Sequence, residues 1–183
     1  MKVLVAYASK HGSTQGIAER IGARLSERGL DADVRPAAQV TDPAPYDAFV
    51  VGGAAYMFHW MKDAADLVRR HRSLLASRPA WLFSSGPLGT ETVDAAGKDV
   101  RQAAEPKEFE ELERSIHPRA TRVFFGAFDP EAKPIGIVER LMRLAPASAE
   151  TLPAGDFRDW EAIDAFADEI SAELAQHAAP VGG

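Results

Sequence analysis

The chain has 183 residues, of which 46% are hydrophobic and 26% charged, and its net charge is −6 at pH 7. This size and composition predict one soluble globular domain with a substantial core, and the acidic balance argues against a nucleic-acid-binding protein. The absence of cysteine excludes disulfides, thiolate-ligated metal sites and a cysteine nucleophile. Met1 and Lys2 lead directly into an apolar run, and no apolar stretch approaches the roughly 20 residues of a membrane-spanning helix. We therefore expect a cytoplasmic protein without a targeting segment.

The first predicted strand, residues 2–8, is followed by the hexapeptide Ser9–Thr14 and by a predicted helix over residues 13–28. A turn of glycine and hydroxyl residues at a helix N-terminus presents backbone N–H groups and the positive end of the helix dipole to an anion. The hexapeptide lacks the lysine of the nucleotide loop GxxxxGK[ST], and Gly12 and Gly16 do not form the dinucleotide pattern GxGxxG. It therefore predicts a phosphate site of another kind, with simple capping of the helix by a hydroxyl as the alternative.

Apolar strand-like segments and amphipathic helical segments alternate along the rest of the chain. The further predicted strands are residues 32–35, 46–53, 80–84 and 122–128. The further predicted helices are residues 62–76, 106–116, 135–144 and 160–176, the last of them capped by Asp159. This alternation is typical of a parallel sheet that is covered by helices on both faces.

The hexapeptide resembles the phosphate loop of flavodoxins, [ST]x[ST or H]Gx[ST], which follows the first strand of those proteins. Ser9, Gly12, Ser13 and Thr14 match the pattern, and His11 stands where a small hydroxyl residue is commoner. The resemblance implies FMN as the cofactor, held by its monophosphate in this loop. It also implies a flavodoxin-like, doubly wound α/β fold with a five-stranded parallel sheet of order 2-1-3-4-5 and helices on both faces. We expect residues 1–177 to form this single domain and residues 178–183 to form a flexible tail.

Three loops of unusual composition, residues 9–14, 53–60 and 84–89, follow the first, third and fourth predicted strands. In an open parallel sheet the ligand lies beyond the carboxyl ends of the strands, where the strand order reverses. The expected order places all three loops at that edge, and we expect neither a catalytic side chain nor a metal ligand there. The residues expected to bind the cofactor are Ser9, Lys10, His11, Gly12, Ser13, Thr14, Ala54, Ala55, Tyr56, Met57, Ser84, Ser85, Gly86 and Gly89.

The second loop combines small residues with aromatic ones. The small residues 52–55 would let a ring approach the backbone closely, and the flavodoxin resemblance implies that Tyr56 stacks on the isoalloxazine ring. We expect Trp60 to lie in the core at the start of the next helix, whereas Phe58 fits either the core or the ring. His59 is expected to be a solvated or hydrogen-bonded loop residue rather than a proton donor.

The third loop is expected to offer backbone N–H groups of Ser85 and Gly86 to the pyrimidine side of the flavin, where negative charge develops on reduction. Many flavodoxins carry a second stacking aromatic residue here, and this loop has none. One face of the flavin is therefore expected to be open to a partner molecule.

The C-terminal third resembles the flavodoxin-fold, menaquinone-dependent protoporphyrinogen oxidases. The shared features are residues 46–47 ahead of the third strand, the helix 135–144 and the Asp-Trp start of the last helix at residues 159–160. The resemblance implies an FMN-dependent oxidoreductase with a quinone or another small-molecule substrate. Residues 86–119 depart from those oxidases because they are acidic, and an acidic rim would repel the carboxylates of a tetrapyrrole.

Two other functions stay open as alternatives. One is an electron carrier that docks on a redox partner protein, which the acidic surface favours. The other is a flavin-free interaction module, which the intact phosphate loop disfavours.

The helix 135–144, with Arg140 and Arg143 beside its apolar side chains, also has two interpretations. We favour packing on the sheet edge over weak association with a membrane surface.

Overall fold

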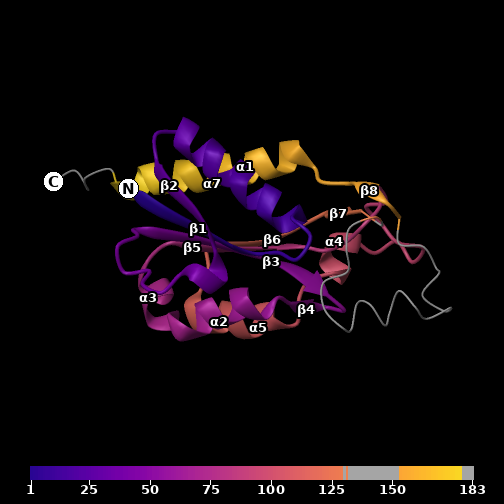
Figure 1. Ribbon diagram of the computed structural model, residues 1–183, viewed down its shortest axis with the longest axis horizontal. Coiled ribbons are helices and arrows are strands. Elements are labelled where there is room, and N and C mark those ends of the chain that lie inside the picture. The colour runs from indigo at the N-terminus through magenta and orange to yellow at the C-terminus, as the bar shows by residue number, and fades with distance from the viewer. Residues whose placement is uncertain (130, 132–152, 179–183) are drawn as a thin grey trace.

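The computed structural model describes residues 1–129, 131 and 153–178, which form an α/β fold around a central parallel sheet (Figure 1). The parallel strands are β1 (Lys2–Ala8), β2 (Asp31–Pro36), β3 (Ala48–Tyr56), β5 (Ala80–Ser85) and β6 (Ala120–Phe124). They are arranged in the order β2-β1-β3-β5-β6. Counted along the chain, this is second, first, third, fourth and fifth, so the predicted order is confirmed. The described residues also form three short antiparallel strands: β4 (His59–Trp60) beside β3, and the ribbon of β7 (Ala127–Phe128) and β8 (Gly155–Asp156).

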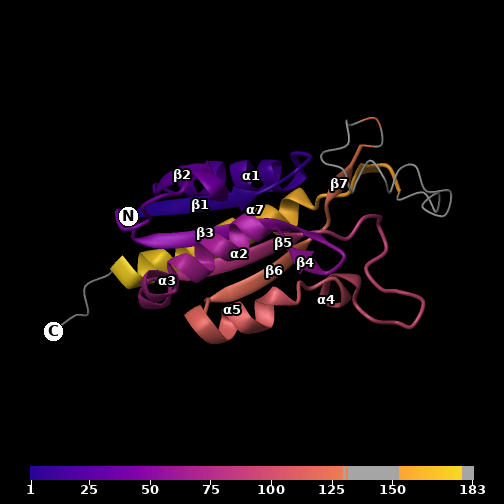
Figure 2. The same ribbon diagram turned by 60° about the horizontal axis from the view of Figure 1, so that its bottom comes forward.

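Helices cover both faces of the sheet, as Figure 2 shows from a second direction. The helices are α1 (Ser13–Glu27), the 3-10 helix η1 (Ala37–Gln39), α2 (Lys62–Arg70), α3 (Arg72–Ser77), α4 (Val100–Ala103), α5 (Glu108–Ile116) and α7 (Trp160–Ala178). Helices α1 and α7 pack against each other on one face, and α2, α3 and α5 lie on the other. Among the described residues, no helix has the length and apolar character needed to cross a membrane.

The strands supply two hydrophobic cores because alternate side chains point to opposite faces. In β1, Val3 and Val5 belong to the cluster under α1 and α7, whereas Leu4 and Ala6 belong to the cluster under α2 and α5. All four side chains are almost completely buried. Burial on both faces explains why this strand reads as a continuous apolar run.

Several predicted boundaries differ from the structure. The predicted helix 62–76 is broken at His71, whose φ of −113° and ψ of 23° lie outside the helical range. The predicted strand 122–128 is two strands, β6 and β7, because the chain leaves the parallel sheet after Phe124 to join the β7–β8 ribbon. The predicted helix 135–144 lies outside the described residues. Of the predicted tail 178–183, only Ala178 is described, and it is the last residue of α7.

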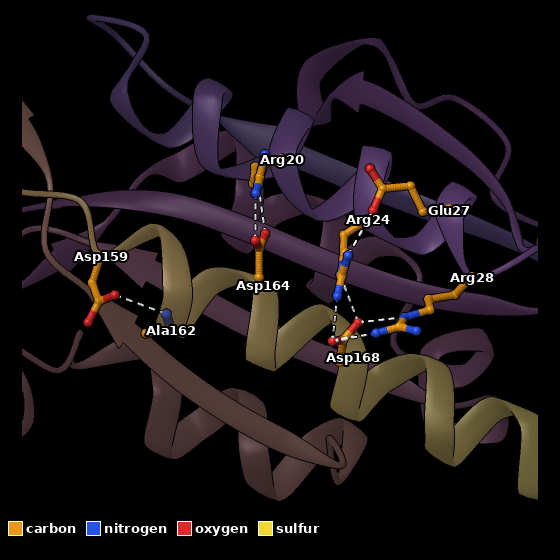
Figure 3. A network of polar contacts seen from close by, with 8 residues as sticks. All are labelled: Arg20, Arg24, Glu27, Arg28, Asp159, Ala162, Asp164 and Asp168. Carbon is orange, nitrogen blue, oxygen red and sulfur yellow. Dashed lines mark hydrogen bonds and ion pairs between the residues drawn. The ribbon is translucent and has the colours of Figure 1, made fainter.

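Helix α7 confirms one local prediction at its first turn. Further along the helix, two of its aspartates form ion pairs with arginines that the sequence did not predict (Figure 3). Asp159 accepts a hydrogen bond from the N–H of Ala162 at 3.0 Å, so it caps the helix as predicted. Asp168 accepts paired hydrogen bonds from Arg24 at 2.9 Å and from Arg28 at 2.8 Å. One turn earlier, Arg20 and Asp164 form a second bidentate pair at 2.5–2.6 Å. These ion pairs join α1 to α7 along their exposed side.

The Asp168 cluster predicts a specific acid sensitivity. The hydrogen bonds from Arg28 and Arg24 hold the pKa of Asp168 well below its ordinary value. A carboxyl whose pKa is lowered by folding stabilises the protein above its unfolded pKa of about 4, and this contribution is lost as the pH falls towards the lowered value. We therefore expect Asp168→Asn to destabilise the protein at pH 7 and to flatten the loss of stability between about pH 5 and pH 2. Urea unfolding followed by circular dichroism at several pH values measures this.

A matched control is Glu173→Gln, an exposed carboxyl on the same helix that makes no ion pair within the described residues. This variant should keep the wild-type pH profile. Equal profiles for Asp168→Asn and the unmodified protein would mean that the arginines do not stabilise the charged carboxylate.

Candidate functional site

The carboxyl ends of three neighbouring strands meet at the end of the sheet that lies away from the chain's N-terminus (Figure 1). In the register of the sheet, Ala8 lies beside Gly53, Gly53 beside Ser84, and Ala54 beside Ser85. The turn after β1, the distal part of β3 and the loop after β5 therefore begin side by side. The structure thus brings the three predicted loops to one edge.

The turn after β1 leads directly into α1. Gly12 adopts a left-handed conformation with φ of 83°, which suits glycine, and its carbonyl accepts the N–H of Gly16 at 2.9 Å. Ser13 is the first residue of the helix. The first backbone N–H groups of a helix have no acceptor within it, and the helix dipole makes this end positive. Lys10 and His11 lie in the same turn. The local structure therefore suits an anion, as the hexapeptide predicts.

Two hydroxyl groups of this turn are held as hydrogen-bond acceptors. Ser9 Oγ accepts from the N–H of Gly12 at 3.1 Å, and Ser13 Oγ accepts from the N–H of Ala127 at 2.8 Å. A hydroxyl has one proton to donate and can also accept. Each of these two groups can therefore accept within the protein while its own proton remains for another acceptor. This arrangement turns both serines into potential donors to an anion.

Thr14, the last residue of the hexapeptide, has a different environment. Its side chain is completely buried, and its Oγ1 lies 2.7 Å from Ser85 Oγ at the end of β5. Ser84, one residue earlier on β5, points to the other face of the sheet, where its hydroxyl has no hydrogen-bond partner among the described residues. Of the two predicted serines of the third loop, only Ser85 contacts the first loop through its side chain.

The backbone of the third loop is partly used within the protein. The N–H of Gly86 donates to the carbonyl of Phe124 at 3.3 Å, so it is not the free donor that we expected. A Cβ at Gly86 would lie 3.4 Å from the Cβ of Ala55, which shows how closely the second and third loops approach. Gly89, further along, has φ of 102° and so requires glycine.

The second predicted loop is a β-hairpin rather than a loop. Strand β3 continues to Tyr56, so Ala54 and Ala55 lie in the sheet, and β4 pairs back with it. Met57 and Phe58 form the two-residue turn with φ of 51° and 63°, the left-handed pair that such tight turns need. Their side chains are 77% and 55% exposed, which excludes the core position considered for Phe58. Tyr56, 41% exposed, stands at the base of this tip.

The glycines ahead of the hairpin are explained by packing rather than by the approach of a ligand. A Cβ at Gly52 would lie 1.9 Å from the Phe83 ring, and a Cβ at Gly53 would lie 2.7 Å from Trp60 Nε1. Trp60 is 3% exposed, and its indole N–H donates to the carbonyls of Gly53 at 3.0 Å and Phe83 at 3.2 Å. The predicted core position of Trp60 is confirmed. Of the small residues 52–55, Ala54 and Ala55 are therefore the two left at the rim of the site.

The N-terminal end of helix α5 holds the hairpin in place through hydrogen bonds. Glu108 accepts the N–H of Trp60 at 2.9 Å and lies 3.0 Å from Nδ1 of His59, while the N–H of Lys107 donates to the carbonyl of Phe58 at 3.0 Å. Burial works against the charge of Glu108, but these hydrogen bonds outweigh it and lower the pKa of Glu108. His59 is thus hydrogen-bonded, as expected.

Two further carboxylates of α5 form ion pairs, which weakens the expected acidic rim. Glu111 pairs with Arg69 at 2.6 Å, and Glu110 pairs with Arg114 at 2.5 Å. Because these two negative charges have arginines beside them, their field on an approaching anion is weaker than that of isolated carboxylates, whereas Glu113 accepts a hydrogen bond from the neutral hydroxyl of Thr121 at 2.9 Å.

Lys10 and Tyr56 come together across the site. Lys10 Nζ lies 4.6 Å from the centroid of the Tyr56 ring, within cation–π distance. This contact connects the first loop to the hairpin. A cationic group and an aromatic face are therefore neighbours at the same edge as the hydroxyls of the turn.

The β7–β8 ribbon contributes contacts to the site that the sequence did not predict. Besides the bond from Ala127 to Ser13, the N–H of Gly126 donates to the carbonyl of Pro87 at 2.9 Å, and the guanidinium of Arg158 lies 3.4 Å from the carbonyl of Ser13. The ribbon thus ties the first loop to the third. Backbone N–H groups carry no residue-type signal, and the sequence predicted the segment 122–128 only as a strand.

Comparisons with known proteins agree with this geometry. Residues 4–142 match a family model described as a flavodoxin domain. Protoporphyrinogen IX dehydrogenase (quinone) of Escherichia coli strain K12 is 23% identical over 179 residues, which cover 93% of this chain and 95% of that protein. A flavodoxin from Pseudomonas aeruginosa has a TM-score of 0.59 at 18% identity, covering 96% of this chain and 99% of that one. Oxidised flavodoxin 2 from Bacillus cereus has a TM-score of 0.57 at 20% identity, covering 95% and 99% of the two chains. With its matching sheet order and a family model that spans most of its length, the chain belongs to the flavodoxin family.

Proposed function

We propose that this protein binds FMN non-covalently and acts as a flavin-dependent oxidoreductase. The observation that carries the proposal is the set of donors at the start of α1, where Ser9 and Ser13 accept from backbone N–H groups and keep their own protons for an anion. Bound FMN would supply the redox chemistry, and the protein would supply binding, orientation and exposure.

The proposed roles follow the three loops. The phosphate would be held by the first loop, and Tyr56 would stack on the ring beside Met57, Ala54 and Ala55. The third loop would line the edge of the ring. The residues assigned to the phosphate are Ser9, Lys10, His11, Gly12, Ser13 and Thr14, and those assigned to the ring edge are Ser84, Ser85, Gly86 and Gly89. None of these side chains is needed as a general acid or base.

The double variant Ser13→Ala/Thr14→Val tests the phosphate site. We expect it to weaken FMN binding by about 1–3 kcal/mol for each charge-assisted hydrogen bond that is lost. Riboflavin lacks the phosphate, so its binding should change much less. Titration of the purified protein with each flavin, followed by absorbance, measures both affinities.

Ser26→Ala is the matched control, because that hydroxyl lies on the same helix and bonds the carbonyl of Gly22 far from the turn. It should leave both affinities unchanged. Unaltered FMN affinity in the double variant would show that the phosphate site is elsewhere. Failure of the unmodified protein to bind FMN would contradict the proposal that FMN is its cofactor.

Tyr56→Ala tests the stacking role. Stacking on an aromatic side chain quenches flavin fluorescence, so the variant should show brighter bound FMN and weaker binding of both FMN and riboflavin. Tyr56→Phe keeps the ring and should behave like the unmodified protein. An unchanged spectrum and affinity in Tyr56→Ala would rule out stacking by this residue.

We propose a protoporphyrinogen-type substrate with a quinone as electron acceptor. The similarity to the E. coli dehydrogenase along almost the whole chain supports this choice. The ion pairs of two α5 carboxylates also reduce the repulsion that an acidic rim would exert on the carboxylates of a tetrapyrrole. Anaerobic mixing of the FMN-loaded protein with protoporphyrinogen and a quinone should produce porphyrin absorbance. If no porphyrin absorbance appears, a second candidate function, an electron carrier, is favoured.

The second candidate is an electron carrier for a partner protein. Two observations favour it: the net charge of −6, and the exposed apolar tip of Met57 and Phe58 beside Tyr56. A carrier would be reduced by a reductase protein without forming porphyrin. The same anaerobic assay therefore separates the two functions.

A further inference from the structure

The buried contact between Thr14 and Ser85 joins two of the loops through their side chains. Thr14 lies in the first turn of α1 and is fully buried, and Ser85 lies at the end of β5 and is 3% exposed. Their hydroxyl oxygens are 2.7 Å apart, and either of them can be the donor. The two residues are separated by 71 positions in the chain, so only the fold creates this pair.

The pair has two possible proton arrangements with different consequences. If Thr14 donates to Ser85, its only proton is used inside the protein. If Ser85 donates to Thr14, the Thr14 hydroxyl accepts and its proton remains for another acceptor. The second arrangement gives the Thr14 hydroxyl the same hydrogen-bond role as those of Ser9 and Ser13, which accept from the N–H groups of Gly12 and Ala127, although Thr14 is fully buried and the two serines are half-buried.

We propose that Ser85 is a positioning residue that holds the Thr14 hydroxyl as a donor towards an anionic group at the start of α1. This inference rests on the proposed function, in which that group is the phosphate of FMN. Ser85 would act through the Thr14 hydroxyl. This role is additional to the backbone contact with the flavin ring that the sequence predicts for Ser85. Its hydroxyl contacts Thr14 in the first turn of α1, so removal of that hydroxyl should affect binding of the phosphate and not of the ring, which Ser85 would meet through its backbone.

The test compares FMN with riboflavin in Ser85→Ala, Ser85→Thr and Thr14→Val. We expect Ser85→Ala to weaken FMN binding about tenfold, the loss of one hydrogen bond, and to leave riboflavin affinity within about twofold. Ser85→Thr retains the hydroxyl and should restore most of the FMN affinity. In a Thr14→Val background, Ser85→Ala should have little further effect on FMN binding, because the hydroxyl that it orients is already gone.

The outcomes are separable. Equal weakening of FMN and riboflavin in Ser85→Ala, or full additivity with Thr14→Val, would overturn the positioning role and leave a structural one. If Ser85→Ala does not fold, Ser85→Cys keeps a similar volume with a weak donor and should show the same selective loss. An unmodified protein that binds riboflavin as tightly as FMN would overturn the phosphate site at the start of α1 and this inference with it, while flavin binding itself would stand. An unmodified protein that binds neither flavin would overturn the proposed function, and the inference with it.

Discussion

Gly52→Ala is expected to lower the free energy of unfolding by about 3 kcal/mol. Gly52 lies in the middle of β3, between β1 and β5, and a Cβ there would come within 1.9–2.3 Å of three atoms of the Phe83 ring. Phe83 is fully buried and packs against Phe124 with ring centroids 6.1 Å apart, so its ring has little room to move. The clash must therefore be relieved by shifting packed side chains or the sheet itself.

Urea unfolding followed by circular dichroism measures this effect, and a second substitution tests its cause. The three atoms that a Cβ would strike are Cζ, Cε1 and Cε2 of Phe83, which leucine lacks. Phe83→Leu should therefore be less harmful in the Gly52→Ala background than in the unmodified protein. Gly86→Ala is the control, because its new Cβ would meet Ala55 at an ordinary 3.4 Å. Additive effects of Gly52→Ala and Phe83→Leu would contradict the steric explanation.

Trp60→Ala is expected to destabilise the protein by about 3–5 kcal/mol. The indole is 3% exposed and meets the Phe109 ring edge-on, with centroids 5.2 Å apart. Its removal leaves a cavity and also leaves the carbonyls of Gly53 and Phe83 without their donor. Trp60→Phe keeps most of the apolar volume but not the N–H, so it should cost an intermediate 1–3 kcal/mol or so.

The control for this prediction is Trp160, the first residue of α7. Trp160 is 37% exposed and contacts the guanidinium of Arg158 at 4.4 Å from its ring, so Trp160→Ala should cost about 1 kcal/mol or less. Chemical denaturation monitored by far-ultraviolet circular dichroism is suitable because it does not depend on tryptophan emission. Equal losses at the two positions would mean that Trp60 is not the anchor of the hairpin.

The hairpin shows where prediction from the chain alone is weakest. A Gly-Gly-Ala-Ala segment followed by aromatic residues reads as a loop, because glycine and alanine are poor strand formers. The structure continues β3 through Ala54 and Ala55 to Tyr56, since β4 pairs with this end and α5 holds it through Glu108. The acidic cluster of α5 had suggested only a charged surface. That Glu108 fastens the hairpin depends on a partner 48 positions away in the chain.

The sequence by itself determined the features that depend on neighbouring residues. Alternation of apolar strands and amphipathic helices predicted the parallel sheet, because such patterns repeat every two or 3.6 residues. The hexapeptide after β1 predicted the turn into α1, and its resemblance to the flavodoxin loop implied the strand order. Only the tertiary structure decided which hydroxyl has which partner. Ser13 bonds a backbone N–H 114 positions away, and Thr14 bonds a side chain 71 positions away. The physical reason is that hydrogen bonds and close packing act over a few ångströms in space, and a single sequence carries little trace of which distant atoms the fold brings within that range.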